Sequence, residues 1–177
     1  MVMSAKNLAV HLNALLDAEL PGLKNIRIGT KTLAFWPYRY LTDPDADEVL
    51  DIFRRVVDRG FHLAFMAHVS HPVELFTLAV QEAIGRILDT GARIRTQSPL
   101  LNHINAGADI WARMWKKQVS LGMIPYYMFV ARDTGAKEYF ALPLGRTWQI
   151  FRKAYGQVSG ICRTVRGPSM SATPGKV

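Results

Sequence analysis

Cysteine is almost absent from this sequence. Cys162 is the single cysteine among 177 residues, so the chain has no second thiol with which to form an internal disulfide. A zinc ion or an iron–sulfur cluster takes three or four ligands, which in most such sites are largely thiolates. One cysteine cannot hold either by itself, and we therefore expect no metal site built on cysteine in this chain.

Long hydrophobic runs are absent as well. The apolar stretches fall far short of the roughly 20 residues of a membrane-spanning helix. The first ten residues lack the basic start and apolar centre of a signal peptide. We therefore expect a cytoplasmic protein with no membrane partner. A hydrophobic share of 49% over 177 residues is enough for one globular domain with a packed core.

Acidic residues are outnumbered by basic ones, 14 to 22, which gives a formal charge of +8. Such a surplus attracts phosphates and other anions. The basic residues are scattered along the sequence, with no basic tail and no nucleic-acid recognition motif. Trp111 and Trp115 interleave with basic residues, as in single-strand binders. They are one helical turn apart and share a face, however, which favours core packing. We therefore expect no nucleic-acid partner.

Helical and strand patterns alternate along the chain. Apolar spacing and capping residues predict helices at about 5–18, 43–60, 72–91, 109–122 and 144–157. Apolar or alternating stretches predict strands at 24–30, from Leu63 to the histidines that follow, and at 92–97, 124–130 and 160–165. Three of the expected helix starts are marked by Asp43, Pro72 and Asp109. This order is typical of βα units in a parallel sheet.

The number of units limits the fold. No Gly-x-Gly-x-x-Gly follows the first strand, so a dinucleotide-binding fold has little support. Five strands are too few to close an eight-stranded barrel. We therefore predict an α/β fold, a partial (βα) TIM-like barrel of about five parallel strands over residues 1–166. Residues 167–177 form a tail rich in Gly, Pro and Ser, with no predicted structure.

The strand at 92–97 predicts what lines this barrel. Successive strand residues face opposite sides. If Ile94 packs under the helices, then Arg93, Arg95 and Gln97 face the interior. Side chains of this kind are unlike the apolar filling of a small barrel. We therefore expect a wide interior that binds anions.

His68 and His71 follow the most apolar strand, in the sequence LAFMAHVSHP. Ligands of parallel sheets gather at the carboxyl ends of strands. The two histidines could form half of a metal site, since imidazole binds most transition metals. No cluster of acidic residues or cysteines lies nearby in the sequence to complete it. Contact with an organic ligand is the favoured interpretation, with a purely structural role as the alternative.

Two further candidates lie late in the chain. Arg132 and Asp133 follow the strand at 124–130, where they could form an ion pair that closes a loop, or Asp133 could bind an ammonium group. Lys176 follows a loop whose composition is similar to that of phosphate-binding loops. Lysine can form a Schiff base, but one residue from a chain end it is more often simply solvated.

Five motifs together indicate a family. They are IRIGTKTLAFWPYRY, HVSHP, RTQSPLLNHIN, IPYYMFVARDTG and TVRGPSMSATPGK. In this order and spacing, from about Asn25 to the end, the chain resembles the later part of the lysine 2,3-aminomutase family of radical SAM enzymes. The resemblance implies a partial barrel holding a 4Fe-4S cluster, S-adenosylmethionine and pyridoxal phosphate. It also implies isomerase chemistry, in which an adenosyl radical starts the migration of an amino group between adjacent carbons of an amino acid.

The resemblance also assigns residues. His68 and Gln97 match family positions near the adenosyl group, and Asn105 matches an asparagine in the loop that follows Gln97. Asp133 lies near the family's substrate-binding aspartate, which an ungapped match aligns with Arg132. Lys176 corresponds to the lysine that anchors pyridoxal phosphate, although here Ser169 to Gly175 replaces the family's run of glycines. These matches predict cofactor-binding and substrate-binding residues and no catalytic or metal-binding residue.

The family's Cys-x3-Cys-x2-Cys triplet has no counterpart in this sequence. We therefore expect the chain to hold no cluster and to be inactive alone, as the carboxyl-terminal portion of an aminomutase-like enzyme whose substrate is an amino acid such as lysine. The alternative is a catalytically silent module that binds phosphate or adenosyl compounds, or a half-barrel completed by a partner chain. Open sheet edges predict self-association.

Overall fold

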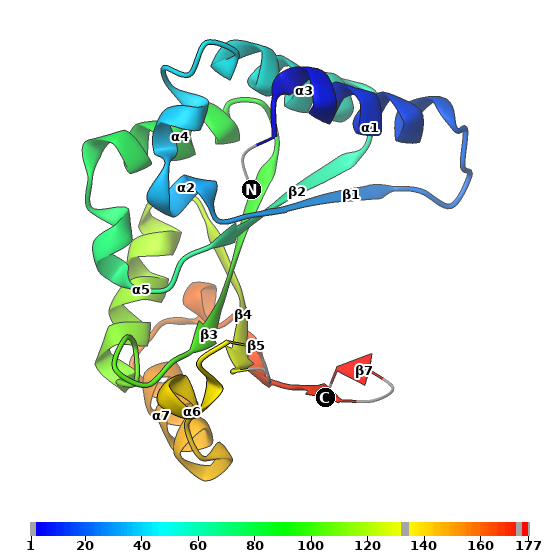
Figure 1. Cartoon of the computed structure of the whole chain (residues 1–177). Helices are drawn as coiled ribbons and strands as arrows, with labels where there is room; N and C mark the ends of the chain where they lie inside the picture. The colour runs from blue at the N-terminus through cyan, green and yellow to red at the C-terminus, as the bar shows by residue number, and fades with distance from the viewer. Residues whose placement is uncertain (1–2, 132–134, 173–174, 177) are drawn as a thin grey trace. The chain divides into compact units, whose positions relative to one another are not determined.

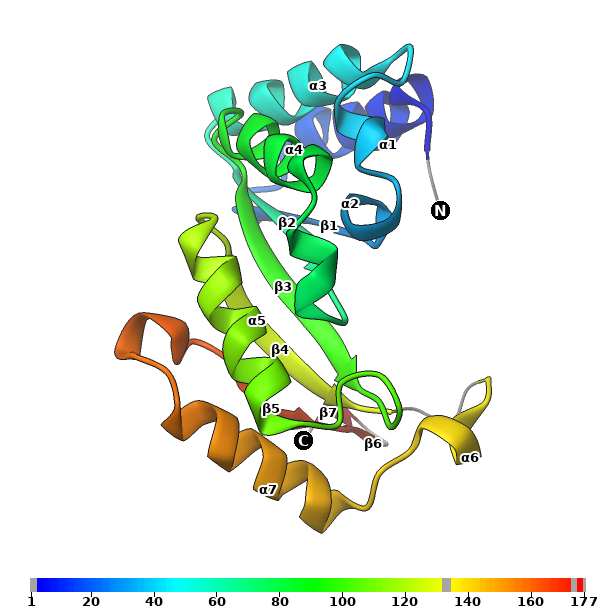
Figure 2. The same cartoon turned by 90° about the vertical axis from the view of Figure 1, so that its left-hand side faces the viewer.

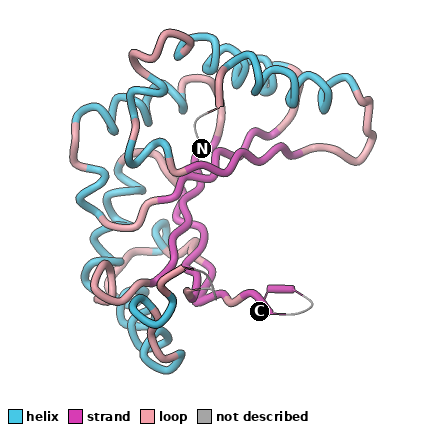
Figure 3. Tube along the Cα trace, in the orientation of Figure 1, coloured by secondary structure: helices cyan, strands magenta, loops and turns pink. Residues whose placement is uncertain are grey.

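The computed structural model describes residues 3–131, 135–172 and 175–176. The helices are α1 (Ala5–Asp17), α2 (Thr32–Phe35), α3 (Ala46–Asp58), α4 (Leu78–Leu88), α5 (Ala108–Ser120), α6 (Lys137–Phe140) and α7 (Leu144–Gly156). Short 3-10 helices are η1 (Pro37–Tyr40), η2 (Pro72–Leu75) and η3 (Gly160–Cys162). The strands are β1 (Asn25–Thr30), β2 (His62–His68), β3 (Arg93–Leu100), β4 (Ile124–Val130), β5 (Arg166–Ser169), β6 (Ser171–Ala172) and β7 (Gly175–Lys176). Figure 3 marks their alternation along the chain.

Five parallel strands form one open sheet in the order β1-β2-β3-β4-β5, and β6 pairs with β7 in a separate antiparallel hairpin. The strands alternate with helices (Figure 1), which confirms the predicted α/β class and is consistent with a partial βα barrel. Each strand follows its sequence neighbour in the sheet, as βα units require. None of the helices among the described residues is long and apolar enough to cross a membrane.

The chain divides into two compact units, which we describe separately. Unit 1 comprises Met1–His68 and Phe76–Arg95, and unit 2 comprises Val69–Leu75 and Thr96–Val177. Strand β3 begins in the first unit and continues into the second. The loop after β2 and the residues around η2 belong to unit 2, although they lie early in the sequence.

Unit 1 is built on the parallel pair β1 and β2, whose register runs from Asn25 opposite His62 to Thr30 opposite Ala67. Helices α1 and α3 lie side by side (Figure 1). The five residues from Leu63 to Ala67 are all buried, which explains why β2 has no polar alternation. Phe65 is at the centre of the core, with ring contacts to Tyr40 and Phe53 at centroid distances of 5.6 and 5.9 Å.

Unit 2 is built on the parallel strands β4 and β5, with α5 and α7 packed against each other (Figure 2). Trp111 and Trp115 of α5 are 1% and 2% exposed, which confirms that their shared face belongs to the core. Trp115 also meets Phe151 of α7 edge to face, with 6.1 Å between ring centroids. These aromatic contacts join the two helices.

Three predicted helix starts were wrong. Pro72 begins only η2, and Thr77 caps α4 by accepting a hydrogen bond from the backbone of Val80. Helix α5 has Gly107 rather than Asp109 at its N-cap. Helix α3 begins after Asp45, and the carboxylate of Asp43 accepts from the indole of Trp36 instead of capping the helix. In each case a nearby side chain or turn offered a competing partner that the local pattern does not reveal.

The predicted strand at 160–165 was also wrong. Residues 160–162 form the 3-10 helix η3, and β4 pairs with β5 in the segment that had no predicted structure. Cys162 and Val165 are buried while Ile161 is 70% exposed. Buried residues three apart are typical of a turn rather than of a strand, whose side chains alternate. Strand β3 runs to Leu100, past its predicted end.

A buried ion pair ties the beginning of the chain to the turn before α3. Arg39 is 3% exposed and donates to both carboxylate oxygens of Asp45, at 2.6 and 3.1 Å, and to the carbonyl of Met3 at 2.9 Å. Asp45 also accepts from the backbone N–H of Ala5 at 2.6 Å. This backbone hydrogen bond and then the Arg39 guanidinium lower the pKa of Asp45. Together these contacts hold the start of α1 on unit 1.

We predict that Arg39→Ala lowers the free energy of unfolding by about 2 to 3 kcal/mol. Removing one partner of a buried pair leaves an uncompensated charge, and the partial exposure of Asp45 moderates that cost. Chemical denaturation measures the difference. Asp51→Asn is the matched control, because Asp51 pairs with Arg54 on the exposed surface of α3, and a change there should cost less than about 1 kcal/mol.

The same pair has a predicted pH dependence. Because the pKa of Asp45 is lowered in the folded state, its contribution is present above the unfolded value of about 3.9 and is lost as the pH falls through the folded value. The stability difference between wild type and Asp45→Asn should therefore be constant near neutral pH and shrink below about pH 4. A difference that persists unchanged in acid would contradict the assigned role of the carboxylate.

We also predict that the purified chain self-associates through its sheet edges. Among the described strands, β1 pairs only with β2 and β5 only with β4, so each presents one unpaired edge. Unpaired backbone edges recruit further strands. Light scattering coupled to size exclusion should show oligomers whose size grows with protein concentration. A single monomeric species over a hundredfold range of concentration would refute this prediction.

Candidate functional site

One group of candidate residues lies in unit 1, where β1 and β2 end. His68 is the last residue of β2 and is half-buried. Burial, and secondly the positive charge of Lys31, lower the pKa of its imidazole. The ring is therefore neutral at pH 7, with one nitrogen able to donate a hydrogen bond and the other able to accept one. This suits a polar heterocycle as a ligand.

Lys31 is a residue of this site that sequence analysis did not identify. It directly follows β1, and the register that pairs Thr30 with Ala67 brings the ends of β1 and β2 together. Its side chain is exposed. The available signal was a basic residue one position after a predicted strand, at the end where ligands gather. Lys31 adds a positive charge suited to a carboxylate or a phosphate.

A second group of candidate residues lies in unit 2, where the loop after β2 meets β3. The backbone N–H of Val69 donates to the carbonyl of Gln97 at 3.2 Å. Along β3 the side chains alternate as predicted, with Ile94 and Thr96 buried and Gln97 half-exposed. Thr96 donates to the side chain of Gln118 at 2.9 Å. The Gln97 side chain is thus on the opposite face from this buried contact.

Asn105 holds these segments together. Its side chain is fully buried, and its amide donates to the carbonyls of Ser70 at 2.8 Å and Pro99 at 3.0 Å. Its side-chain oxygen accepts from the backbone N–H of Leu101 at 2.7 Å, and its own carbonyl accepts from the indole of Trp111. One residue therefore links the loop after β2 with the end of β3 and with α5. The asparagine predicted in the loop after Gln97 has well-defined intramolecular partners.

The structure describes only some of the remaining predicted residues. Arg132 and Asp133 lie outside the described residues. Lys176 lies in β7, paired with Ser171 in the small hairpin. His71 accepts a hydrogen bond at Nδ1 from the backbone of Val73. Ser70, between the two histidines, donates its N–H to Glu74 at 2.9 Å. These bonds give the His68 to His71 loop a fixed turn.

Metal binding has no support in this part of the chain. Within residues 3–131, 135–172 and 175–176, no three His, Cys, Asp or Glu side chains gather closely enough to hold a metal ion. Cys162 is buried, within 3.9 Å of the Ser159 hydroxyl. A cluster that takes three or four thiolates does not fit a chain with one buried cysteine.

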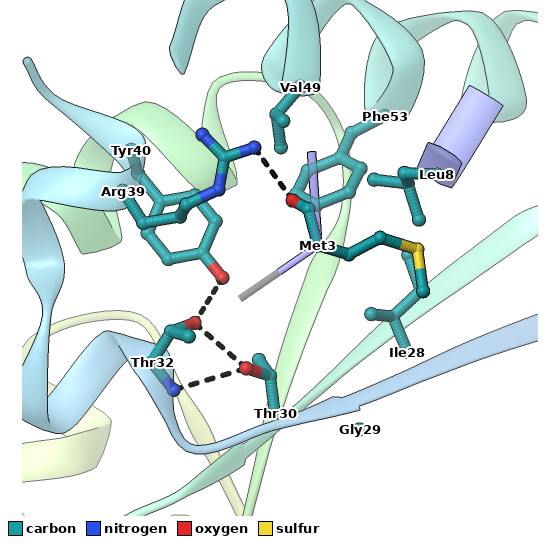
Figure 4. Close-up of a pocket in the computed structure, with 10 residues that line it drawn as sticks. All are labelled: Met3, Leu8, Ile28, Gly29, Thr30, Thr32, Arg39, Tyr40, Val49 and Phe53. Atoms are coloured by element: carbon teal, nitrogen blue, oxygen red, sulfur yellow. Dashed lines mark hydrogen bonds between the residues drawn. The ribbon is translucent and has the colours of Figure 1, made fainter. Parts of the chain in front are cut away.

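Unit 1 also contains a cavity of about 170 Å³, on the helix-covered side of β1 (Figure 4). Apolar residues line one side, among them Ile28, Val49 and Phe53. On the other side the Thr32 hydroxyl is hydrogen bonded to those of Tyr40 at 2.6 Å and Thr30 at 2.8 Å. Burial raises the pKa of Tyr40, which keeps its hydroxyl protonated. This cavity involves none of the predicted site residues.

Comparison with known proteins gives clear relatives. No protein-family model matches the chain. It is 32% identical over 160 residues to a protein of Aquifex aeolicus (strain VF5) provisionally named an L-lysine 2,3-aminomutase, covering 90% of this chain and 42% of that protein. It is 24% identical over 143 residues to the glutamate 2,3-aminomutase of Clostridioides difficile (strain 630), covering 81% of this chain and 32% of that enzyme. The chain thus spans less than half the length of these relatives.

Solved structures give a similar fold. A radical SAM methyltransferase from Sphaerobacter thermophilus matches with a TM-score of 0.50 and 12% identity, covering 96% of this chain and 58% of that chain. At this identity the likeness concerns the fold alone.

We predict that Asn105→Ala lowers the free energy of unfolding by about 3 kcal/mol, because it leaves two carbonyls and one N–H without partners in a buried site. The amide of Leu101 should also exchange its hydrogen much faster. Asn102→Ala is the matched control in the same loop, since Asn102 bonds only the exposed His103 through its side chain. Equal losses in the two variants would contradict the central role of Asn105.

Proposed function

We propose a function from one premise: the chain is homologous to the lysine 2,3-aminomutases, and its fold is that of radical SAM enzymes. In our proposal the chain is the carboxyl-terminal portion of an aminomutase-like isomerase and carries residues for the adenosyl group and the substrate. The observation that carries the proposal is the network around Asn105, which joins the loop after His68 to the end of β3 beside Gln97.

His68 and Gln97 contact the adenosyl part of S-adenosylmethionine in this proposal. The neutral imidazole of His68 offers one donor and one acceptor, and the Gln97 amide offers both as well. Asn105 keeps the two loops at a fixed separation. When bound with its cluster, S-adenosylmethionine supplies the radical for such reactions. Within the intact enzyme this chain's residues orient it but do not hold the cluster, because Cys162 is the single cysteine.

The substrate of the intact enzyme is an amino acid in this proposal. The two relatives described above are named for lysine and glutamate, which share an α-amino group and a carboxylate. Lys31 offers a positive charge for a carboxylate next to His68. Asp133 or Arg132 binds the other end of the substrate, and an aspartate there would favour an ammonium group. Lys176 anchors pyridoxal phosphate.

The chain alone is inactive, and we propose to test this by titrating S-adenosylmethionine and pyridoxal phosphate separately into the purified protein. Isothermal titration calorimetry should give no saturable binding of either, because the chain spans less than half the length of the relatives and, in this proposal, carries only part of each site. Saturable binding of one compound at micromolar concentration would favour the silent binding module instead. That outcome would refute the proposal that the chain is an inactive portion of an enzyme.

A chimera tests the residue assignments. The chain is joined behind the segment of an aminomutase relative that contains the cysteine triplet, and amino-group migration is measured on L-lysine and L-glutamate. We expect activity in the chimera, and at least a tenfold loss with His68→Gln. His71→Gln is the matched control, since His71 bonds its own loop, and should retain activity. Equal losses would contradict the assignment of His68. A chimera that binds S-adenosylmethionine but is inactive on both substrates would contradict the proposed reaction.

A further inference from the structure

The positive charge of the chain is concentrated in unit 2. Unit 1 contains 11 Lys and Arg against 10 Asp and Glu, a net charge of +1. Unit 2 contains 11 Lys and Arg against 4 Asp and Glu, a net charge of +7. The two values add to the +8 of the whole chain. The basic residues are evenly spread in the sequence, and the difference comes from the acidic residues.

This imbalance limits how far unit 2 can neutralise itself. With 4 acidic residues, at least seven of its 11 basic side chains have no acidic partner within the unit under one-to-one pairing. In unit 1, by contrast, Arg39, Arg54 and Arg86 pair with carboxylates. An unbalanced set of cations produces a positive potential that attracts polyanions. Unit 2 therefore has the electrostatics of a polyanion-binding surface.

Helix α7 concentrates this charge. Thr147, Ile150 and Ala154 are its buried residues. Its three basic residues, Arg146, Arg152 and Lys153, are all exposed, and the segment Leu144–Gly156 contains no acidic residue. One side of α7 thus packs on the protein and the others present cations to solvent.

Aromatic rings line the same helix. Trp148 and Phe151 stack with 5.9 Å between centroids and an interplanar angle of 22°. Phe151 and Tyr155 follow at 5.3 Å and 35°. Trp148 is 48% exposed. The guanidinium of Arg163 lies 5.5 Å from the centre of the Tyr155 ring.

The helical spacing places a cation among these rings. Arg152 is four residues after Trp148 and three before Tyr155, so the three share one face of α7. An exposed indole held by a stacked neighbour, with Arg152 on the same helix face and Arg163 against Tyr155, offers a flat surface for a base and cations for the adjoining phosphates. We call Trp148, Phe151, Arg152, Tyr155 and Arg163 the α7 strip.

We propose that the α7 strip binds single-stranded nucleic acid. Single-strand binders combine aromatic platforms with cations that follow the phosphates, and they need no sequence motif. An acidic protein would use the charge but not the stacked rings. A lipid surface favours a broader apolar face than this helix offers. The proposal does not depend on the aminomutase homology. It is contrary to the expectation, drawn from the scattered basic residues and the lack of a recognition motif, that the chain has no nucleic-acid partner.

The test is fluorescence anisotropy of the full chain with a labelled oligothymidylate at several salt concentrations. We expect binding at low salt that weakens as salt increases, with a log–log slope of roughly −2 to −3 for three or four phosphate contacts. Trp148→Ala should weaken binding roughly tenfold, because stacking of one base is lost, while Trp148→Phe should retain most of it.

Charge is tested with a matched pair of double variants. Arg152→Gln with Lys153→Gln should weaken binding and reduce the slope by up to about 1.4, or about 0.7 per phosphate contact. Arg54→Gln with Arg55→Gln removes two adjacent exposed cations from α3 in unit 1 and should leave affinity unchanged. Thermal melts verify that each variant is folded.

Three results would each overturn the proposal: no binding at low salt, equal losses in the two double variants, or a folded Trp148→Ala variant that binds as wild type does. Equal affinity for heparin or for vesicles of anionic lipid would also overturn it, since these show a general anion surface. Loss of binding in Trp148→Ala with retention in Trp148→Phe and in the α3 variant is the result that supports it.

Discussion

The candidate site depends on the hydrogen bonds of the buried Asn105 side chain. A loop at the end of a parallel strand has backbone groups that the sheet no longer pairs, and burying them without partners is costly. The side chain of Asn105 hydrogen bonds the carbonyls of Ser70 and Pro99 and the N–H of Leu101. Asn105 therefore fixes the loop after β2 and the loop after β3 relative to each other, although they are far apart in the sequence. A ligand site formed by both loops would be organised before any ligand arrives, which reduces the ordering cost of binding.

Unit 1 uses the same principle with a charged pair. Arg39 and Asp45 hold the start of α1 against the turn before α3. Arg86, which belongs to α4, donates to the carbonyl of Tyr40 at 2.7 Å. The apolar core around Phe65 supplies most of the favourable burial, but it does not fix where the loops run. Buried polar contacts fix the start of α1 and the turn before α3 in unit 1, as Asn105 fixes the loop after His68 in unit 2. Stability and site geometry thus have different physical sources in this protein.

The distribution of charge separates the two units more clearly than their secondary structure does. Both contain parallel strands covered by helices, yet the acidic residues are mostly in unit 1, where several pair with arginines. Unit 2 keeps its cations largely without such partners inside the unit. Its outer helix α7 places them beside a row of stacked rings. This surface belongs to a helix, whereas His68 belongs to the end of a strand, so the two proposed functions use different residues.

The sequence by itself determined the α/β class, the bounds of β4 and the buried faces of β2 and α5, because these depend on apolar periodicity within one segment. It also identified the strand end that carries His68, the strand that contains Gln97, and the motifs of the family. Only the tertiary structure decided that Thr77 caps α4, that β5 begins at Arg166, and that Asn105 joins Ser70 to Pro99. The β4–β5 pairing and the hydrogen bond from Asn105 to Ser70 depend on partners distant in the sequence, which no local pattern records. The Thr77 cap bonds Val80 nearby and competes locally with Pro72 for the start of the helix.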